Sequence, residues 1–326
     1  MTQAAVPGVP AKATQGAEAQ HRDFGWAEAS IWTDRTVSAL ANGVTGGKWF
    51  SLADKVIRPS TLEAAWRQVA RTKEAAGADG QSVERFAAAA ERYLSELHQT
   101  LKTGRYRPSP VRRVDIPKSG GGTRPLGIPT VKSLPQAKAA DRIVQTALNM
   151  AIEPIPRVRP LAGPRTCFEA EFGAGSYGFR PGRGCKSPPP AKAGDALREV
   201  EGLLKAGYVH VVDADLQSYF DTIPHDRLMV QVAQKISDGR VLALIEGCLS
   251  HGVMKEMEHW RPTAGTPQGA VISPLLANIY LHPLDRLMAE SGYRMVRYAD
   301  DFVILCRTAQ EAQAALRRAM AWVAMA

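Results

Sequence analysis

Acidic residues cluster at the ends of two apolar stretches of this sequence. Residues 208–216 end in Asp213-Ala-Asp215-Leu216, and Ala299-Asp300-Asp301 separates the strand-like residues 295–298 from the apolar residues 302–306. An unpaired carboxylate among apolar residues is costly, so a bound cation is the natural compensator. Carboxylate oxygens suit Mg²⁺, which takes further ligands from substrate phosphates, and two such ions about 3.5–4 Å apart support nucleotidyl transfer.

The two stretches must be neighbouring strands if these groups are to act together. Residues 208–216 predict a buried strand, and residues 295–298 and 302–306 predict a β-hairpin with a tight turn between them. We therefore expect Asp215, Asp300 and Asp301 to form one cluster, with Asp213 on the same strand face as Asp215. On its own, an Asp-Asp pair in a hairpin is most often only a turn.

A second expected hairpin carries basic residues. Residues 106–118 and 123–129 are extended in pattern, and Ser119-Gly-Gly-Gly122 between them predicts a flexible turn. Lys118 and Arg124 would stand on its two arms, where both can reach one triphosphate. The alternative is a solvated basic hairpin without a ligand.

Apolar spacing places helices along most of the chain. Ser60-Thr-Leu-Glu63 reads as a capping box before a helix at 64–70, and further helices are expected at 82–101, 141–152, 196–206, 224–237, 273–287 and 309–326. Strands interleaved with helices predict an α+β fold. Stretches 133–140, 156–167 and 187–194 are rich in Pro, Ala and basic residues, and we expect exposed extended loops there, either tolerated surface insertions or loops that make additional contacts with a partner.

Composition favours a polyanionic partner. The 326 residues carry 41 Lys plus Arg against 32 Asp plus Glu, a formal charge of +9, with 45% apolar residues for a core. The four cysteines are scattered, which indicates neither a zinc ribbon nor a disulfide framework. The N-terminal stretch lacks an apolar segment, so we expect a cytoplasmic protein with no membrane partner. The oligomeric state is left open.

Five segments, in order, make the chain resemble the reverse transcriptases encoded by group II introns. They are Arg124-Pro-Leu-Gly-Ile-Pro-Thr130, Ser176-Tyr-Gly-Phe-Arg-Pro-Gly-Arg183, Asp213-Ala-Asp-Leu-Gln-Ser-Tyr-Phe-Asp-Thr-Ile-Pro-His225, Gly265-Thr-Pro-Gln-Gly-Ala-Val-Ile-Ser-Pro-Leu-Leu-Ala-Asn-Ile-Tyr280 and Tyr298-Ala-Asp-Asp301. The resemblance implies a right-hand polymerase with fingers and an antiparallel palm sheet. It also implies an RNA-directed DNA polymerase that uses two Mg²⁺ ions, deoxynucleotides, an intron RNA template and a DNA primer or target.

The resemblance divides the chain into a poorly structured segment 1–48, a fingers-like region 49–207 and a palm 208–326. The family continues past the Asp-Asp hairpin into a primer grip, a thumb and a maturase region. Here the chain ends soon after that hairpin, so we expect the thumb to be absent. This polypeptide alone would then be inactive or dependent on a partner fragment.

The resemblance also implies residue roles. Asp215 and Asp300 would be catalytic metal ligands, with Asp301 completing the cluster, and Phe220 would exclude a ribose 2′-hydroxyl by clash. The remaining nucleotide-binding residues would be Lys118, Arg124, Ser218, Tyr219 and Gln268, and the template-binding residues Tyr177, Phe179, Arg180 and Arg183. Gln217 departs from the lysine common in the family, which removes one positive charge near the phosphates.

Two alternatives remain at this point. A related reverse transcriptase used in bacterial defence or diversity generation shares the palm aspartates. A catalytically inactive, truncated RNA-binding fragment of a mobile element accounts for the short C-terminal part, whereas the intact Asp215, Asp300 and Asp301 favour an enzyme.

Overall fold

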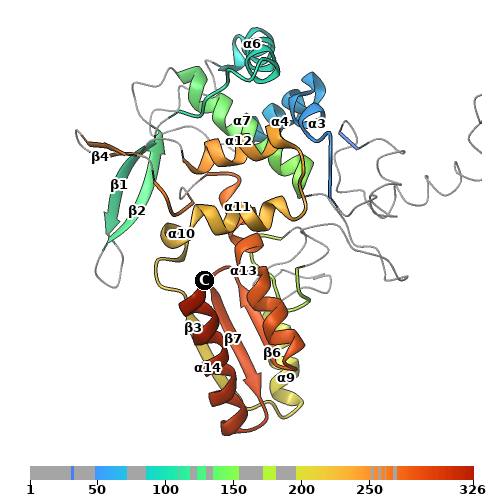
Figure 1. Cartoon of the computed structure of the whole chain (residues 1–326), viewed down its shortest axis with the longest axis vertical. Coiled ribbons are helices and arrows are strands. Elements are labelled where there is room, and N and C mark those ends of the chain that lie inside the picture. Colours follow the sequence, from blue (N-terminus) through green and yellow to red (C-terminus); the bar gives the residue numbers. More distant parts are fainter. Residues whose placement is uncertain are drawn as a thin grey trace, which may run out of the picture.

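Helices fill one end of the molecule, and a three-stranded sheet forms the other end (Figure 1). The computed structural model describes residues 31–32, 48–71, 86–109, 111–117, 123–129, 135–153, 172–180, 196–250, 253–255, 258–260, 262–266 and 270–326. For 111–117, 123–129, 135–139, 253–255 and 258–260, only the backbone is described.

The helical end is built around α7 (Pro135–Ile152), which packs against α4 (Pro59–Arg71) and α3 (Ala53–Ile57). Helices α6 (Ala90–Lys102), α11 (His225–Ala233) and α12 (Gly239–Leu249) complete this end. Asp238 caps α12 by accepting hydrogen bonds from the main chain of the first turn, and its second oxygen accepts one from Ala53 N at 2.8 Å. One carboxylate thus fixes the start of two helices.

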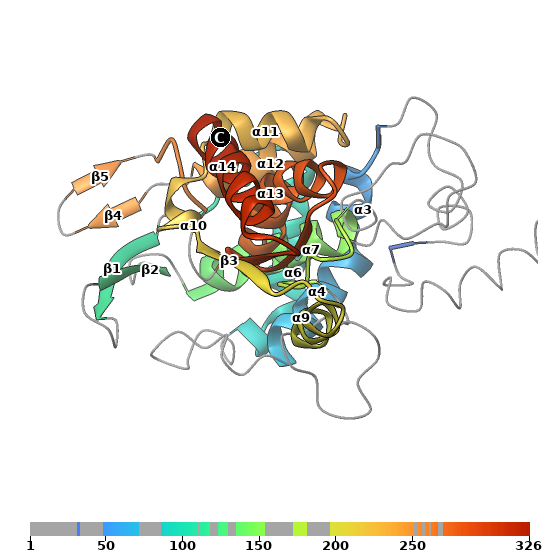
Figure 2. The ribbon, with the colours of Figure 1, turned by 90° about the horizontal axis from the view of Figure 1, so that it is seen from below.

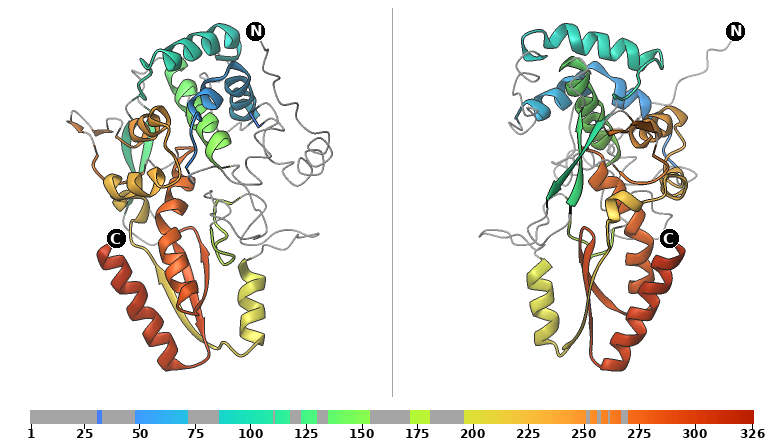
Figure 3. Two further views of the ribbon diagram at one scale, coloured as in Figure 1. Left: turned by 45° about the vertical axis from the view of Figure 1, so that its right-hand side comes forward. Right: turned by 90° about the vertical axis from the view of Figure 1, so that its left-hand side faces the viewer.

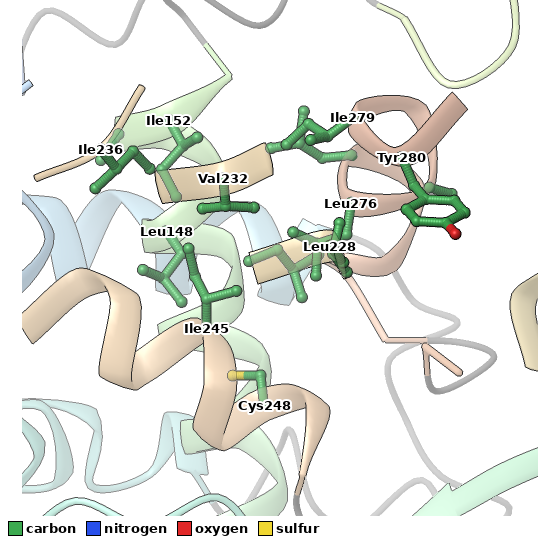
Figure 4. Close-up of a cluster of buried hydrophobic side chains, with 14 of the residues drawn as sticks. Leu148, Ile152, Leu228, Val232, Ile236, Ile245, Cys248, Leu276, Ile279 and Tyr280 are labelled. Carbon is green, nitrogen blue, oxygen red and sulfur yellow. The ribbon is translucent and has the colours of Figure 1, made fainter. Parts of the chain in front are cut away.

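A single apolar core crosses the expected boundary between residues 49–207 and 208–326. Figure 4 shows side chains of α7, α11, α12 and α13 (Ser273–Glu290) meeting around Leu148, Val232 and Ile245. All three of these side chains are fully buried. The helical end and the sheet end therefore share one hydrophobic cluster, which extends from Ile31 to Ala319.

The three-stranded sheet has the order β3-β7-β6, with antiparallel neighbours. Its strands are β3 (His210–Asp215), β6 (Arg294–Tyr298) and β7 (Asp301–Cys306). Helices α9 (Ala196–Lys205) and α14 (Ala309–Met325) cover opposite faces of this sheet (Figure 3).

The sequence of β7 explains why the central strand is covered on both sides. Phe302, Ile304 and Cys306 alternate toward the main core, where small residues of α14 are buried. Leu305 points the other way and joins a separate cluster with Val296 of β6 and Ala196 of α9. Apolar residues at every position after Asp301 are the pattern expected when both faces of a strand are buried.

A second sheet has the order β2-β1-β4-β5 and projects from the helical end (Figure 2). It consists of β1 (Val111–Pro117), β2 (Thr123–Pro129), β4 (Val253–Lys255) and β5 (Glu258–Trp260), and β1 runs parallel to β4. The predicted basic hairpin is therefore confirmed as β1 and β2, and two strands of the expected palm region extend it.

Most helix predictions are confirmed, with differences at the starts. Helices α9, α11, α13 and α14 lie where the sequence predicts them. Helix α7 begins at Pro135, so most of the stretch 133–140, expected to be a loop, is helical. Helix α4 begins at Pro59, which places Ser60 inside the helix rather than at its cap. The sequence patterns do not predict α3, α10 (Tyr219–Thr222), α12, β4 or β5.

The expectation that residues 208–216 form a buried strand is wrong. Strand β3 is an edge strand in which Val212 alone is buried, because β7 pairs with one side of it and α14 covers one face. Most of the segment 1–48, expected to be disordered or poorly structured, lies outside the described residues; of those described, Ile31 and Trp32 are fully buried, and Trp32 Nε1 donates to Met150 O at 3.2 Å. No described helix is both long and apolar enough to cross a bilayer.

Candidate active site

The register of the sheet brings the predicted acidic residues together. Asp215 ends β3, Asp301 begins β7, and the two are directly paired across the strands. Opposed residues point to the same face, and Asp213, paired with Val303, shares that face. Asp300 lies in the two-residue turn that joins β6 to β7. Three carboxylates that are up to 86 residues apart in sequence thus meet at one end of the sheet.

Burial and neighbouring negative charges raise the pKa of two carboxylates in this cluster, Asp300 and Asp301. The pKa of Asp301 is raised by burial first and then by the negative charges of Asp215 and Asp300, and its side chain is hydrogen-bonded to Asp215. Burial is also the main cause of the raised pKa of Asp300. The negative charge of Asp215 raises this pKa further, whereas the positive charge of Arg297 lowers it. Such an accumulation of negative charge favours binding of a cation.

The donor set fits Mg²⁺ by its chemistry. Among the residues that the structure describes, no three His, Cys, Asp or Glu side chains stand close enough to hold a metal by themselves. Mg²⁺ is usually bound by one or two carboxylates with waters and substrate phosphates, rather than by a closed protein cage. Asp215, Asp300 and Asp301 therefore suit a cation that a phosphate-bearing substrate helps to hold.

The turn between β6 and β7 has a left-handed residue at its first position. Ala299 adopts φ 61°, as two-residue hairpin turns require, although alanine disfavours this region. Its carbonyl oxygen accepts a hydrogen bond from Nη1 of Arg297 at 2.7 Å. The backbone before Asp300 is thus held by a side chain from the preceding strand.

Arg297 is fully buried, and all five of its N–H groups are satisfied. Its guanidinium forms a bidentate ion pair with Asp285 at 2.7 and 2.6 Å. The three remaining hydrogen bonds go to Asn278 Oδ1 (3.0 Å), Ser176 Oγ (2.8 Å) and the Ala299 carbonyl. Burial alone would lower the pKa of Arg297, but the Asp285 carboxylate raises it, so the side chain stays charged.

No local sequence pattern indicates a role for Arg297, because its side-chain partners are distant in the chain. Asp285 and Asn278 lie 12 and 19 residues away on α13, and Ser176 lies 121 residues away. A charged residue inside an otherwise strand-like stretch was the available signal. Only the assembled structure shows where its five donors go.

Residues 172–180 lie along β6 and reach the turn. Arg297 N donates to Gly175 O at 2.7 Å, and Tyr177 N donates to Arg297 O at 2.8 Å. A side chain on Gly175 would overlap the carbonyl oxygen of Met295, and one on Gly178 would overlap the main chain of Ala299. Glycine at these two positions therefore permits a close approach of two backbones.

The three described template candidates in this segment are placed differently. Tyr177 is buried, and its hydroxyl donates to Glu199 of α9. Arg180 is buried as well, and its Nη1 donates to two carbonyls of its own segment at 2.7 and 2.8 Å. Phe179 adopts φ 59° and remains 45% exposed. Of these three, only Phe179 presents its ring at the surface.

The residues after β3 form a tight turn and the short helix α10 (Tyr219–Thr222). Ser218 is exposed with φ 53°, and Tyr219 is buried with its hydroxyl donating to Ala277 O at 2.6 Å. The ring of Phe220 is partly exposed between two rings that meet it edge-on, those of Tyr219 (centroids 5.5 Å apart) and Phe179 (6.0 Å). The Tyr219 side chain is therefore directed into the protein, its main-chain N donates to Leu216 O at 3.2 Å within the turn, and Ser218 is exposed beside it.

Residues 262–266 dock on this turn and its following helix. Thr266 N donates to Phe220 O at 2.6 Å, and Gly265 N donates to Ile223 O at 2.8 Å. Gly265 adopts φ 90°, and a side chain there would lie 2.9 Å from the carbonyl oxygen of Asp221. The carbonyl of Gly265 is 2.6 Å from His225 Nε2. The segment that precedes Gln268 is thereby joined to the Phe220 turn.

Several predicted site residues lie outside the described part of the chain. Lys118, Arg183 and Gln268 are among them, so their roles stay predictions. The backbone of Arg124 lies in β2, paired with Ile116 of β1, while its side chain is not described. The described site therefore consists of the acidic cluster, the Arg297 network, the segment 172–180 and the Phe220 turn.

Comparison with known proteins identifies the family. Residues 116–326 match the family described as "Reverse transcriptase (RNA-dependent DNA polymerase)". This range includes the acidic cluster, the Phe220 turn and residues 172–180.

Three relatives illustrate the similarity. The chain is 37% identical over 241 residues to "Protein YkfC" of Escherichia coli, which covers 72% of this chain and 56% of that protein. It is 32% identical over 243 residues to "Group II intron-encoded protein LtrA" of Lactococcus lactis. The aligned region covers 72% of this chain and 34% of that protein. It is 34% identical over 210 residues to "Uncharacterized 91 kDa protein in cob intron" of Schizosaccharomyces pombe. The aligned region covers 64% of this chain and 21% of that protein. The chain thus spans between 21% and 56% of the length of these relatives.

Proposed function

The chain belongs to the reverse transcriptase family, with relatives among group II intron-encoded proteins, and we propose that it is an RNA-directed DNA polymerase. It adds deoxynucleotides to the 3′-hydroxyl of a primer paired with an RNA template. The observation that carries this proposal is the direct pairing of Asp215 with Asp301 beside Asp300. This pairing supplies the carboxylates that phosphoryl transfer needs.

Asp215 and Asp300 hold the cations, and Asp301 completes the negative cluster. Two Mg²⁺ ions, when bound, supply charge that activates the primer hydroxyl and stabilises the leaving pyrophosphate. The chain's own contribution is positioning, because Arg297 holds the Ala299 carbonyl and so fixes the turn from which Asp300 projects. The mutual repulsion of the carboxylates keeps the cluster receptive to a cation.

The incoming nucleotide lies against the turn at 218–220. The main chain of Ser218 and Tyr219 binds the triphosphate, and the Phe220 ring excludes a ribose 2′-hydroxyl. Lys118 and Arg124 on the basic hairpin bind the phosphates, and Gln268 contacts the nucleotide or the template. The hydrogen bond from Thr266 N to Phe220 O supports this arrangement, because it links the segment before Gln268 to the residue that is proposed to exclude the 2′-hydroxyl.

The nucleic-acid partner is an RNA template, with a DNA primer or target. The formal charge of +9 supports binding to a polyanion, and the names of relatives point to intron RNA as the template. Arg183 remains a proposed template contact. Tyr177 and Arg180 contribute by holding the segment 172–180, since both are buried within the protein.

Incorporation of deoxynucleotides on a primed RNA with Mg²⁺ tests the proposed function. We expect extension by this chain and a loss of about 10³-fold in the Asp215→Asn variant, because about 4 kcal/mol of transition-state stabilisation is removed. Asp213→Asn is the matched control: this carboxylate lies on the same strand and face but farther from the turn, and its loss should cost only a few-fold.

Two results would contradict the proposal. Equal loss in Asp215→Asn and Asp213→Asn would indicate a general electrostatic effect rather than a metal ligand. Binding of the primed RNA with no extension, by the chain alone or supplemented with a fragment of a relative that follows the matched region, would indicate an RNA-binding protein.

A further inference from the structure

Phe179 differs from its neighbours in the segment 172–180. Tyr177 and Arg180 turn their side chains into the protein, whereas Phe179 is 45% exposed. Its backbone has φ 59°, a conformation that is unusual for a bulky residue. Such a conformation persists only where the surrounding contacts determine it.

Contacts on both sides of Phe179 determine this conformation. Before it, Gly178 lies against the main chain of Ala299, and its carbonyl accepts a hydrogen bond from Asn278 Nδ2 at 2.8 Å. After it, the Arg180 guanidinium is bound to carbonyls of the same segment. With both flanks fixed, the backbone directs the Phe179 ring outward instead of into the core.

The Phe179 ring meets the ring of Phe220 edge-on. Their centroids are 6.0 Å apart and their planes cross at 81°, within the range of favourable aromatic pairs. Phe220 meets Tyr219 on another side, at 5.5 Å and 66°, and the Tyr219 hydroxyl is bound to Ala277 O. The partly exposed Phe220 ring is therefore held between a buried ring and a surface ring.

We propose that Phe179 is a specificity-determining residue that holds the Phe220 ring in place, so that the polymerase discriminates deoxynucleotides from ribonucleotides. This inference rests on the proposed function, in which Phe220 lies against the sugar. A steric gate excludes the 2′-hydroxyl only while its ring cannot rotate away, because a mobile ring relieves the clash. Phe179 is a positioning residue, since it acts through Phe220.

The test compares the ratio of kcat/KM for dATP to that for ATP on a primed RNA template. Phe179→Asn removes the ring but retains a residue that tolerates a left-handed backbone. We expect this ratio to fall roughly threefold to tenfold, the range that loss of one aromatic pair gives. Phe179→Tyr keeps an aromatic ring at this position, so this variant should retain the ratio of the unaltered chain. Phe50→Asn, which alters another exposed phenylalanine at 61% exposure, is the matched control and should leave the ratio unchanged.

A double-mutant cycle separates positioning from other effects. Phe220→Ala should lower the ratio more than Phe179→Asn does, and Phe179→Asn should add nothing in the Phe220→Ala background. An unchanged ratio in Phe179→Asn, or full additivity of the two changes, would overturn the proposal. An unchanged ratio with weaker binding of fluorescent RNA would assign Phe179 to the template instead.

Equilibrium binding keeps this proposal distinct from the proposed function. Affinities of dATP and ATP for the complex with primer and template can be measured with Ca²⁺ in place of Mg²⁺, without turnover. Preference for dATP that weakens in Phe179→Asn would support the positioning role, even in a chain that does not extend primers. Equal affinities of the unaltered chain for both nucleotides would overturn it.

Discussion

The two sides of the turn at Ala299 treat charge in opposite ways. Behind the turn, the Arg297 guanidinium is fully buried, and each of its donors has a partner. In front of it, Asp215 and Asp301 are exposed, and their negative charges reinforce one another. The charge behind the turn is therefore neutralised by its partners, whereas the negative charges in front of it repel one another.

This contrast shows how a site can combine a rigid backbone with side chains that are open to a ligand. A buried charge with all its hydrogen bonds satisfied fixes the backbone, because losing any partner is costly. The carboxylates on that backbone remain at least partly exposed, and we propose that they bind a cation and its substrate. Changes at the rear should therefore affect stability and activity together, and changes at the front should affect activity alone.

The largest effect is expected at the front, for Asp300→Asn. This change removes a proposed metal ligand, so primer extension should fall about 10³-fold, which corresponds to about 4 kcal/mol. The free energy of unfolding should stay the same or rise slightly, because one repulsive charge is lost. Extension rates and urea denaturation measure the two quantities. A large loss of stability in this variant would break the contrast.

The next effect is expected at the rear, for Arg297→Met. Removal of the guanidinium leaves Asp285 buried without its partner, so the free energy of unfolding should fall by about 3–5 kcal/mol. Extension should decrease in the remaining folded fraction, because the Ala299 carbonyl loses its donor. Arg294→Met is the control, since that arginine is exposed on the same strand. A comparable loss in both variants would show that burial of Arg297 is not the cause.

A smaller effect is expected where the segment 172–180 touches the turn, for Gly178→Ala. The added methyl group would overlap the Ala299 main chain, so the turn or the segment must move, at a cost of about 3 kcal/mol. Thermal denaturation and extension assays should both report the change. Gly173→Ala is the matched control, because its methyl group would make an ordinary contact at 3.7 Å with the Asp285 side chain. Equal tolerance of both changes would argue against close packing at Gly178.

The smallest effect concerns Asp141 at the helical end, whose hydrogen-bond donors among the described residues are uncharged. Its carboxylate accepts hydrogen bonds from the Tyr106 hydroxyl at 2.6 Å and from Ser109 N at 3.0 Å. Burial raises the pKa of Asp141 to about 6, and these hydrogen bonds oppose the rise. The folded state thus binds this proton more tightly than the unfolded state does.

The sign of the pH dependence follows from that difference. The contribution of Asp141 to the free energy of unfolding should fall by about 2 kcal/mol as the pH rises from 4 to 7. Urea denaturation of the unaltered chain and of Asp141→Asn at pH 4, 5, 6 and 7 isolates this contribution as the difference between them. A difference that stays constant with pH would contradict the raised pKa.

Local patterns were sufficient to predict the hairpin that carries the acidic pair. Residues 295–298 and 302–306 are strand-like, and the short polar interval between them permits only a tight turn. The helices α9, α13 and α14 were likewise predictable, because their apolar residues repeat with helical spacing. The edge position of β3 was not, because a run of Val211 and Val212 does not reveal how many strands will pair beside it.

The roles of individual aromatic and basic residues were less predictable. Tyr177, Phe179 and Arg180 share one motif, and their residue types alone suggest the same use for all three. The structure buries the first and last and leaves Phe179 beside Phe220, because left-handed φ at Phe179 reverses the direction of its side chain. A dihedral angle set by packing against Ala299 cannot be inferred from neighbours in the sequence.

Residue types and local spacing were enough to indicate the candidate carboxylates, the motifs of the reverse transcriptase family and the positions of most helices and strands. These features depend on residue type and on spacing over a few positions. Tertiary structure alone decided that Asp215 opposes Asp301, that Arg297 supports the turn, and that Phe179 contacts Phe220. Each of these contacts joins residues that become neighbours only when the chain folds, through strand register, buried hydrogen bonds and ring packing.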